Sequence, residues 1–168
     1  MRTAFLPRLI NCTAGTAAVE MALVTPILMV LMFGAFDLGN YFLQQHIVTK
    51  AVRDGARYAG RQSFAEFAGC TPSSTVEQRT RNITRTGIVA NGGTPRIANW
   101  TNPASITVAA ACDTSGTYTG IYTDVAIGAP RVTVSAVVTY NSLFGQFGLL
   151  TNATVNMRAQ SESAVMGV

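Results

Sequence analysis

The feature that most constrains this chain is an uncharged, strongly apolar segment near its N-terminus. Residues 21–36 carry no charged side chain, and apolar residues continue on both sides of them. As a helix these residues would span about 24 Å, and a few flanking residues bring the length to the ~30 Å of a bilayer's hydrocarbon core. The segment therefore predicts a membrane-spanning helix.

Glu20 stands at the start of this segment, where a carboxylate is expensive. An acidic residue at the centre of a spanning helix is unfavourable by roughly 3 kcal/mol. Glu20 is therefore a functional residue, or it lies at the headgroup level, where the cost nearly vanishes. The residues alone leave both interpretations open.

A short basic stretch precedes the apolar segment. Residues 1–15 contain Arg2 and Arg8 and end at Gly15. This layout resembles a signal sequence, except that the small residue comes before the apolar run instead of after it. A cut after Gly15 would remove the basic leader and leave the whole apolar segment on the mature chain.

The N-terminal third of the chain resembles the TadE-like pseudopilins of tight-adherence (Tad/Flp) pilus systems. The resemblance runs over residues 15–60, and the short length of the chain favours a minor pseudopilin of the TadE or TadF type. The matching features, in chain order, are GTAAVE at residues 15–20, Pro26, the acid–Leu–Gly step that begins at Asp37, and AVRDGARYA at residues 51–59.

This resemblance implies processing and assembly. A prepilin peptidase would cut between Gly15 and Thr16, so that residues 1–15 are a leader. Glu20 would then lie one helical turn from the new amine of Thr16 and pair with it, on its own chain or on a neighbouring one. Because a paired buried carboxylate costs much less than an unpaired one, Glu20 would favour assembly in one register.

The resemblance also implies where the chain acts and with which partners. The expected partners are the prepilin peptidase, other pseudopilins, the Tad assembly machinery and the lipid bilayer. The expected location is the bacterial inner membrane, as a single-pass protein with a cytoplasmic N-terminus and a periplasmic or extracellular C-terminal domain. Incorporation into the pilus is a further expectation. Charge alone does not fix this orientation, because basic residues flank the segment on both sides.

The helix is expected to continue beyond the membrane, from residue 16 to residue 62. Its second half contains no proline, and its apolar residues recur at helical spacing. Small residues on one side would let a partner backbone approach closely; they are Ala51, Gly55 and Ala59. Basic residues form a stripe that is either a solvated face or a surface that lies against anionic headgroups or an acidic partner; they are Lys50, Arg53, Arg57 and Arg61.

Residues 63–168 predict a small exported α+β domain with an antiparallel sheet, in a pilin-like arrangement. A capping-box pattern at Ser74 predicts a helix to about residue 88. The apolar connection at residues 143–150 is either a loop folded over the core or a contact patch. The predicted strands are 105–111, 118–127, 131–140 and 154–160, the last pairing antiparallel with the strand before it.

The cysteines agree with an exported domain. Cys12 lies in the leader, which leaves Cys70 and Cys112 as an even pair in the mature chain. In a compartment that permits disulfides we expect these two to be joined. The alternative is a pair of buried free thiols.

Several function classes find no support in the sequence. It has no nucleic-acid motif, no phosphate-binding loop and no nucleophile–histidine set, since His46 is the single histidine. Asp113 and Asp124 lack metal-ligand spacing. We therefore expect no catalytic residue, no cofactor, no metal and no nucleic-acid partner. The competing interpretation is a single-pass membrane protein whose exported domain binds a ligand or a surface, unrelated to pili.

Overall fold

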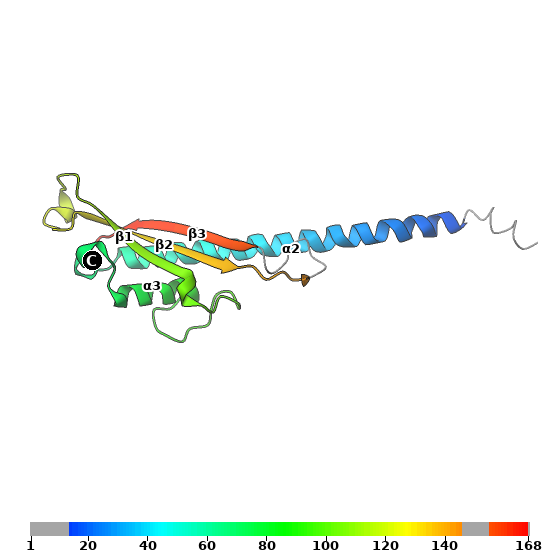
Figure 1. Ribbon diagram of the computed structural model, residues 1–168, viewed down its shortest axis with the longest axis horizontal. Coiled ribbons are helices and arrows are strands. Elements are labelled where there is room, and N and C mark those ends of the chain that lie inside the picture. Colours follow the sequence, from blue (N-terminus) through cyan, green and yellow to red (C-terminus); the bar gives the residue numbers. More distant parts are fainter. Residues whose placement is uncertain (1–13, 146–154, 168) are drawn as a thin grey trace, which may run out of the picture.

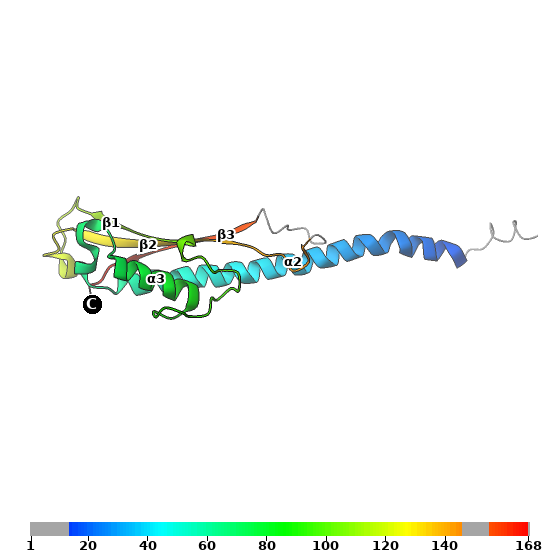
Figure 2. The ribbon, with the colours of Figure 1, turned by 60° about the horizontal axis from the view of Figure 1, so that its bottom comes forward.

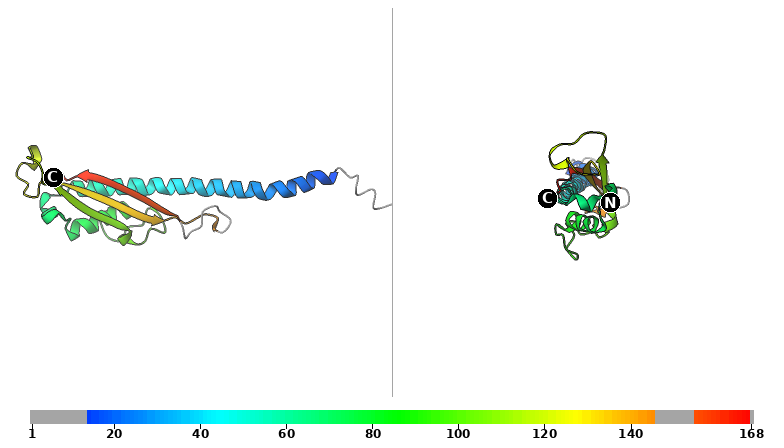
Figure 3. Two further views of the ribbon diagram at one scale, coloured as in Figure 1. Left: turned by 45° about the horizontal axis from the view of Figure 1, so that its top comes forward. Right: turned by 90° about the vertical axis from the view of Figure 1, so that its left-hand side faces the viewer.

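The computed structural model describes residues 14–145 and 155–167. One long helix, α2 (Ala14–Gly60), runs through the molecule, and the rest of the described chain packs along its C-terminal half (Figure 1). The N-terminal part of α2, residues 15–32, projects clear of this domain (Figure 3, left). The architecture is α+β, with a projecting apolar helix and a small antiparallel sheet, as the sequence predicts.

Helix α2 is a single element of 47 residues even though Pro26 lies inside it. Proline lacks an N–H and so leaves a gap in the helical hydrogen bonds. Next to this gap the Thr25 hydroxyl donates to the carbonyl of Met21 at 2.6 Å. The carbonyl that loses its usual partner at Pro26 belongs to Ala22, four residues earlier, so the Thr25 bond lies one residue before the gap.

The sheet has three antiparallel strands in the order β1-β2-β3, with β1 at Ile106–Asp113, β2 at Ala129–Thr139 and β3 at Asn156–Ala164. The predicted pairing of the last strand with the one before it is confirmed, with Ala136 opposite Ala159. The alternation in β2 is also confirmed, because one set of side chains is buried: Val132, Val134, Ala136 and Val138.

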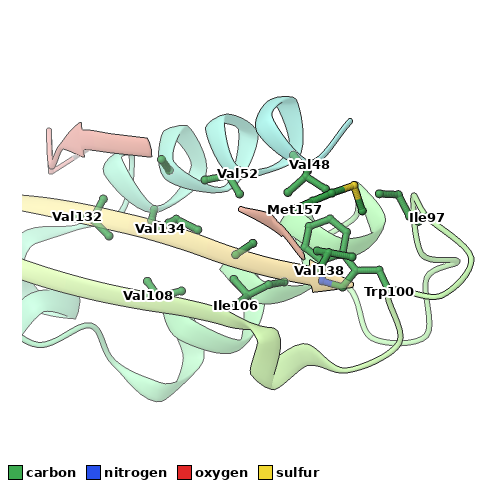
Figure 4. Packing of buried hydrophobic residues seen from close by; sticks show 14 of the residues in the cluster. Val48, Val52, Ile97, Trp100, Ile106, Val108, Val132, Val134, Val138 and Met157 are labelled. Atoms are coloured by element: carbon green, nitrogen blue, oxygen red, sulfur yellow. The ribbon is translucent and has the colours of Figure 1, made fainter. Parts of the chain in front are cut away.

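The core lies where the sheet meets α2 and the second helix, α3 (Ser74–Thr86) (Figures 2 and 4). Gly55 lets the two helices approach closely, as the sequence predicts for this position. A Cβ added at Gly55 would lie 2.0 Å from the Thr84 Oγ1, so a side chain cannot fit there without movement. The helix side chains that enter the core are Val48, Ala51, Val52, Ala56 and Ala59.

Helix α3 begins and ends slightly differently from its prediction. The N-cap is Ser73 and not Ser74, because the Ser73 Oγ accepts a hydrogen bond from the Val76 N–H at 3.2 Å. The helix ends at Thr86, before the predicted residue 88. Gly87 adopts a left-handed conformation with φ of 83°, which stops the helix and which glycine accepts without strain.

The predicted strand at residues 118–127 is wrong. The β1–β2 ladder closes where Asp113 pairs with Ala129, so residues 114–128 form the connection beyond the paired ends. Two glycines there have left-handed φ values, Gly120 at 71° and Gly128 at 75°. The segment contains only a short 3-10 helix, η3 (Gly120–Tyr122). Two other short 3-10 elements are η1 (Phe64–Cys70) and η2 (Pro103–Ser105).

Candidate functional site

The projecting half of α2 is an uncovered apolar surface. Every described side chain from residue 15 to residue 32 is exposed, including Leu23 at 69% and Leu31 at 60%. Within the described ranges, one helix is long and apolar enough to cross a membrane: α2, with a mean hydropathy of 2.1 over its most apolar window. Such a surface is costly in water, and a single-pass anchor in lipid explains it.

The structure places the predicted processing and assembly residues at the tip of this helix. Gly15, Thr16 and Glu20 lie in the first two turns of α2. Gly15 has no atom within 4 Å of the position that a Cβ would take. The Glu20 side chain is exposed. Thr16 is still joined to Gly15 in this chain, so the pairing of Glu20 with a free Thr16 amine stays a prediction.

A buried carboxylate marks the point where the projecting helix meets the domain. Asp37 lies on α2, directly after the uncharged segment, and its exposed fraction is 0%. The Tyr140 hydroxyl donates to its Oδ1 at 2.7 Å, and the Ser142 hydroxyl donates to its Oδ2 at 2.8 Å. The backbone N–H of Leu143 donates to Oδ1 at 2.9 Å. The chain that follows β2 is therefore tied to the helix.

The hydrogen bonds at Asp37 also fix the tyrosine. Asn40 donates from its Nδ2 to the Tyr140 oxygen at 3.0 Å, and the Tyr41 ring meets the Tyr140 ring edge to face, with centroids 5.3 Å apart. Burial raises the pKa of the Tyr140 hydroxyl above its usual value, and its hydrogen bond to Asp37 acts in the same direction. The hydroxyl stays protonated and available as a donor at neutral pH.

Sequence reasoning missed this cluster. It used Asp37 only as part of the acid–Leu–Gly resemblance, because the groups that contact it lie about a hundred positions away in the chain. Two signals point to it in retrospect. Asp37 is the first charge after residues 21–36, and the polar Tyr140 and Ser142 directly follow a buried strand.

The disulfide joins Cys70, at the end of η1, to Cys112 in β1, with the two Cα atoms 5.8 Å apart. The bond closes a loop with a sequence separation of 42, which is worth about 3–4 kcal/mol by chain-entropy arguments. It ties the start of the domain to the sheet.

We expect thiol labelling of the denatured, unreduced protein to leave Cys70 and Cys112 unmodified, because both sulfurs are in the bond. The same labelling after reduction should modify both, which is the control for reagent access. Peptide mass mapping separates these residues from Cys12. Ready labelling of both cysteines before reduction would contradict the pairing.

The basic stripe is solvent-exposed at Lys50, Arg53 and Arg57 on α2 and at Arg61, directly after its end. Beside it, Arg96 forms an ion pair with Asp54 at 2.9 Å. An open groove of about 360 Å³ lies between α2 and α3 at this place. The stripe is therefore a charged surface that water or an anionic partner can reach.

Metal and acid–base chemistry find little support in the described residues. No group of three or more His, Cys, Asp or Glu side chains is placed to hold a metal ion within residues 14–145 and 155–167. Asp113 accepts from the Ser115 hydroxyl at 2.6 Å and from its backbone N–H at 2.9 Å. These two bonds hold the pKa of Asp113 at about 2, so it is a turn-forming carboxylate.

Comparison with known families finds one match, and it lies on α2. Residues 15–57 match the family model described as TadE-like protein. The chain carries a TadE-like segment. The match begins at Gly15 and covers both the projecting half of α2 and most of the half that packs against the sheet. TadE-like proteins are structural components of pili and associate with membranes.

The comparisons go no further than this segment. No curated protein and no solved structure matches the chain. The sheet, α3 and the Asp37 cluster are therefore interpreted from their own geometry.

Proposed function

We propose that this protein is a minor pseudopilin of the TadE or TadF type, a structural and assembly component of a Tad (Flp) pilus that acts in pilus biogenesis and surface adherence. One observation carries the proposal: the TadE-like match starts at the glycine that opens an exposed apolar helix. A helix with this surface needs lipid or neighbouring subunits to cover it. A pilin-like protein is covered by lipid before assembly and by neighbouring subunits after it.

The proposal includes maturation by a prepilin peptidase at the cytoplasmic face of the inner membrane, which would cut between Gly15 and Thr16 and release residues 1–15. The apolar half of α2 would span the membrane with its N-terminus in the cytoplasm, and the domain would lie in the periplasm or outside the cell. The disulfide agrees with that side of the membrane.

Cleavage after Gly15 is the experiment that tests this proposal. Co-expression with a prepilin peptidase should yield a shorter product whose first residue is Thr16, as mapped by mass spectrometry. Gly15→Val should block the shift almost completely, because a branched side chain replaces the small residue at the cut. Gly39→Val is the matched control, since a Cβ there also meets no atom within 4 Å, and it should be processed normally.

A different mature N-terminus would contradict the predicted site. No peptidase-dependent shift at all would favour the competing function, a membrane-anchored binding protein that no prepilin peptidase processes. The partners proposed here, which are the peptidase, other pseudopilins and the Tad assembly machinery, would then lose their support.

A further inference from the structure

The turn that follows β2 lies at the level where the apolar half of α2 ends. Residues 15–36 rise about 33 Å along the helix, close to the ~30 Å thickness of the hydrocarbon core. Asp37 is the next residue, so the boundary between lipid and water falls near it. The described chain after β2 continues along α2 toward this boundary (Figure 1).

The turn also extends below Asp37, toward the membrane. The Phe144 ring packs on the Phe33 ring with centroids 4.8 Å apart, and Phe33 lies one helical turn before Asp37, inside the uncharged segment. Leu143 beside it is 60% exposed, and Phe36 on the helix is 61% exposed. The apolar surface of the helix is thus continuous with an apolar surface on the turn.

We propose that residues 142–145 form a second membrane contact, in which the Leu143 and Phe144 side chains enter the lipid interface beside α2. The proposal rests on the membrane anchoring proposed above. Its occupant is lipid because the surface continues the lipid-facing half of α2. Aromatic and aliphatic side chains next to a span are typical of the headgroup boundary.

The Asp37 cluster is suited to hold such a turn at the boundary. An unpaired carboxylate or backbone N–H at this depth would be costly. Asp37 accepts from two hydroxyls, those of Tyr140 and Ser142, and from the Leu143 N–H, so the polar groups satisfy one another. The turn can then present its apolar side chains to lipid.

Two contacts constrain the domain more than one helix does. A domain carried on a single helix is free to rotate about the helix axis relative to the bilayer. A turn seated in the interface on one side of α2 fixes which face of the sheet points toward the membrane. The inferred consequence is a defined orientation of the domain before any assembly step.

Depth-dependent quenching in lipid nanodiscs tests the proposal on the full-length chain. Three variants place a tryptophan at exposed apolar positions: Leu143→Trp in the turn, Leu23→Trp in the span and Ile121→Trp in η3. Leu23 is 69% exposed and Ile121 57% exposed, close to Leu143. The segment that holds Ile121 lies at the opposite end of the domain from the projecting helix (Figure 1). The native Trp100 is buried and gives the same background in each.

We expect lipids with brominated acyl chains to quench Leu143→Trp and Leu23→Trp, and to leave Ile121→Trp no more quenched than the parent chain. If Leu23→Trp is quenched but Leu143→Trp is quenched no more than Ile121→Trp, the second contact is overturned and the anchoring stays intact. If Leu23→Trp is not quenched, the anchoring itself fails and the proposal fails with it. A blue-shifted Leu143→Trp emission without bromine quenching indicates a second copy of the chain on the turn, which also overturns the proposal.

Discussion

Replacing Asp37 with alanine is expected to lower the free energy of unfolding of the C-terminal domain by about 2–4 kcal/mol. Hydrogen bonds to a buried charged acceptor stabilise a fold more than neutral ones do, and a buried donor that loses its acceptor is left desolvated without a partner. The carboxylate accepts from Tyr140, Ser142 and the Leu143 N–H. Tyr140 retains an alternative acceptor, since its hydroxyl lies 2.9 Å from the Asp37 carbonyl. The Leu143 N–H loses its acceptor on Asp37.

The measurement is chemical denaturation of the full chain in nanodiscs, followed by Trp100 fluorescence. Trp100 is a suitable reporter because it is 2% exposed and lies in the core of the domain (Figure 4). Asp124→Ala is the matched control, because this aspartate is exposed and a surface substitution usually changes stability by less than about 0.5 kcal/mol. Asp37→Asn should fall between the two, because its amide oxygen still accepts but carries no charge.

Equal stability of the Asp37→Ala and parent chains would show that the cluster does not hold the turn. Combining Asp37→Ala with Leu143→Trp separates the two roles of the cluster. If the domain stays folded and bromine quenching at position 143 disappears, Asp37 positions the turn. If quenching persists, the turn seats itself in lipid without the carboxylate.

The helices were predictable because their signals are local. A long uncharged run, helical spacing and the absence of proline between residues 27 and 71 indicate α2 without reference to any other part of the chain. Gly55 was predictable as a point of close approach for the same reason, although the sequence does not say that α3 supplies the partner. The strict alternation of side chains in β2 indicated which face of that strand is buried.

The Asp37 cluster was not predictable from local patterns, because its energy comes from contacts between residues far apart in the chain.

The false strand at residues 118–127 has a related cause. Its threonines and tyrosines favour extended structure, but the register that ends with Asp113 opposite Ala129 leaves no strand beside it. The predicted apolar connection at residues 143–150 is described only to Gly145, and the rest of it lies outside the described residues.

The second large effect is expected at Glu20, and it concerns assembly. In the processed chain Glu20 would lie one turn from the Thr16 amine, where pairing offsets the cost of a charge in lipid. Removing one partner of a buried ion pair costs about 3–5 kcal/mol. Glu20→Ala should therefore insert and be cleaved at least as well as the parent chain, yet lose association with partner pseudopilins and pilus-dependent attachment.

Glu20→Gln separates charge from size and should fail in the same way, because the amide cannot neutralise the amine. Met21→Ala is the matched control. Met21 is a neighbouring side chain, 65% exposed, and its truncation removes apolar area but no charge, so assembly should persist. The measurements are co-purification with partner pseudopilins and surface attachment in a host that lacks the native copy. Normal assembly of both Glu20 variants would contradict this prediction. Glu20 would then be a residue at the headgroup level, whose carboxylate is solvated at the membrane surface and does not set the register between subunits.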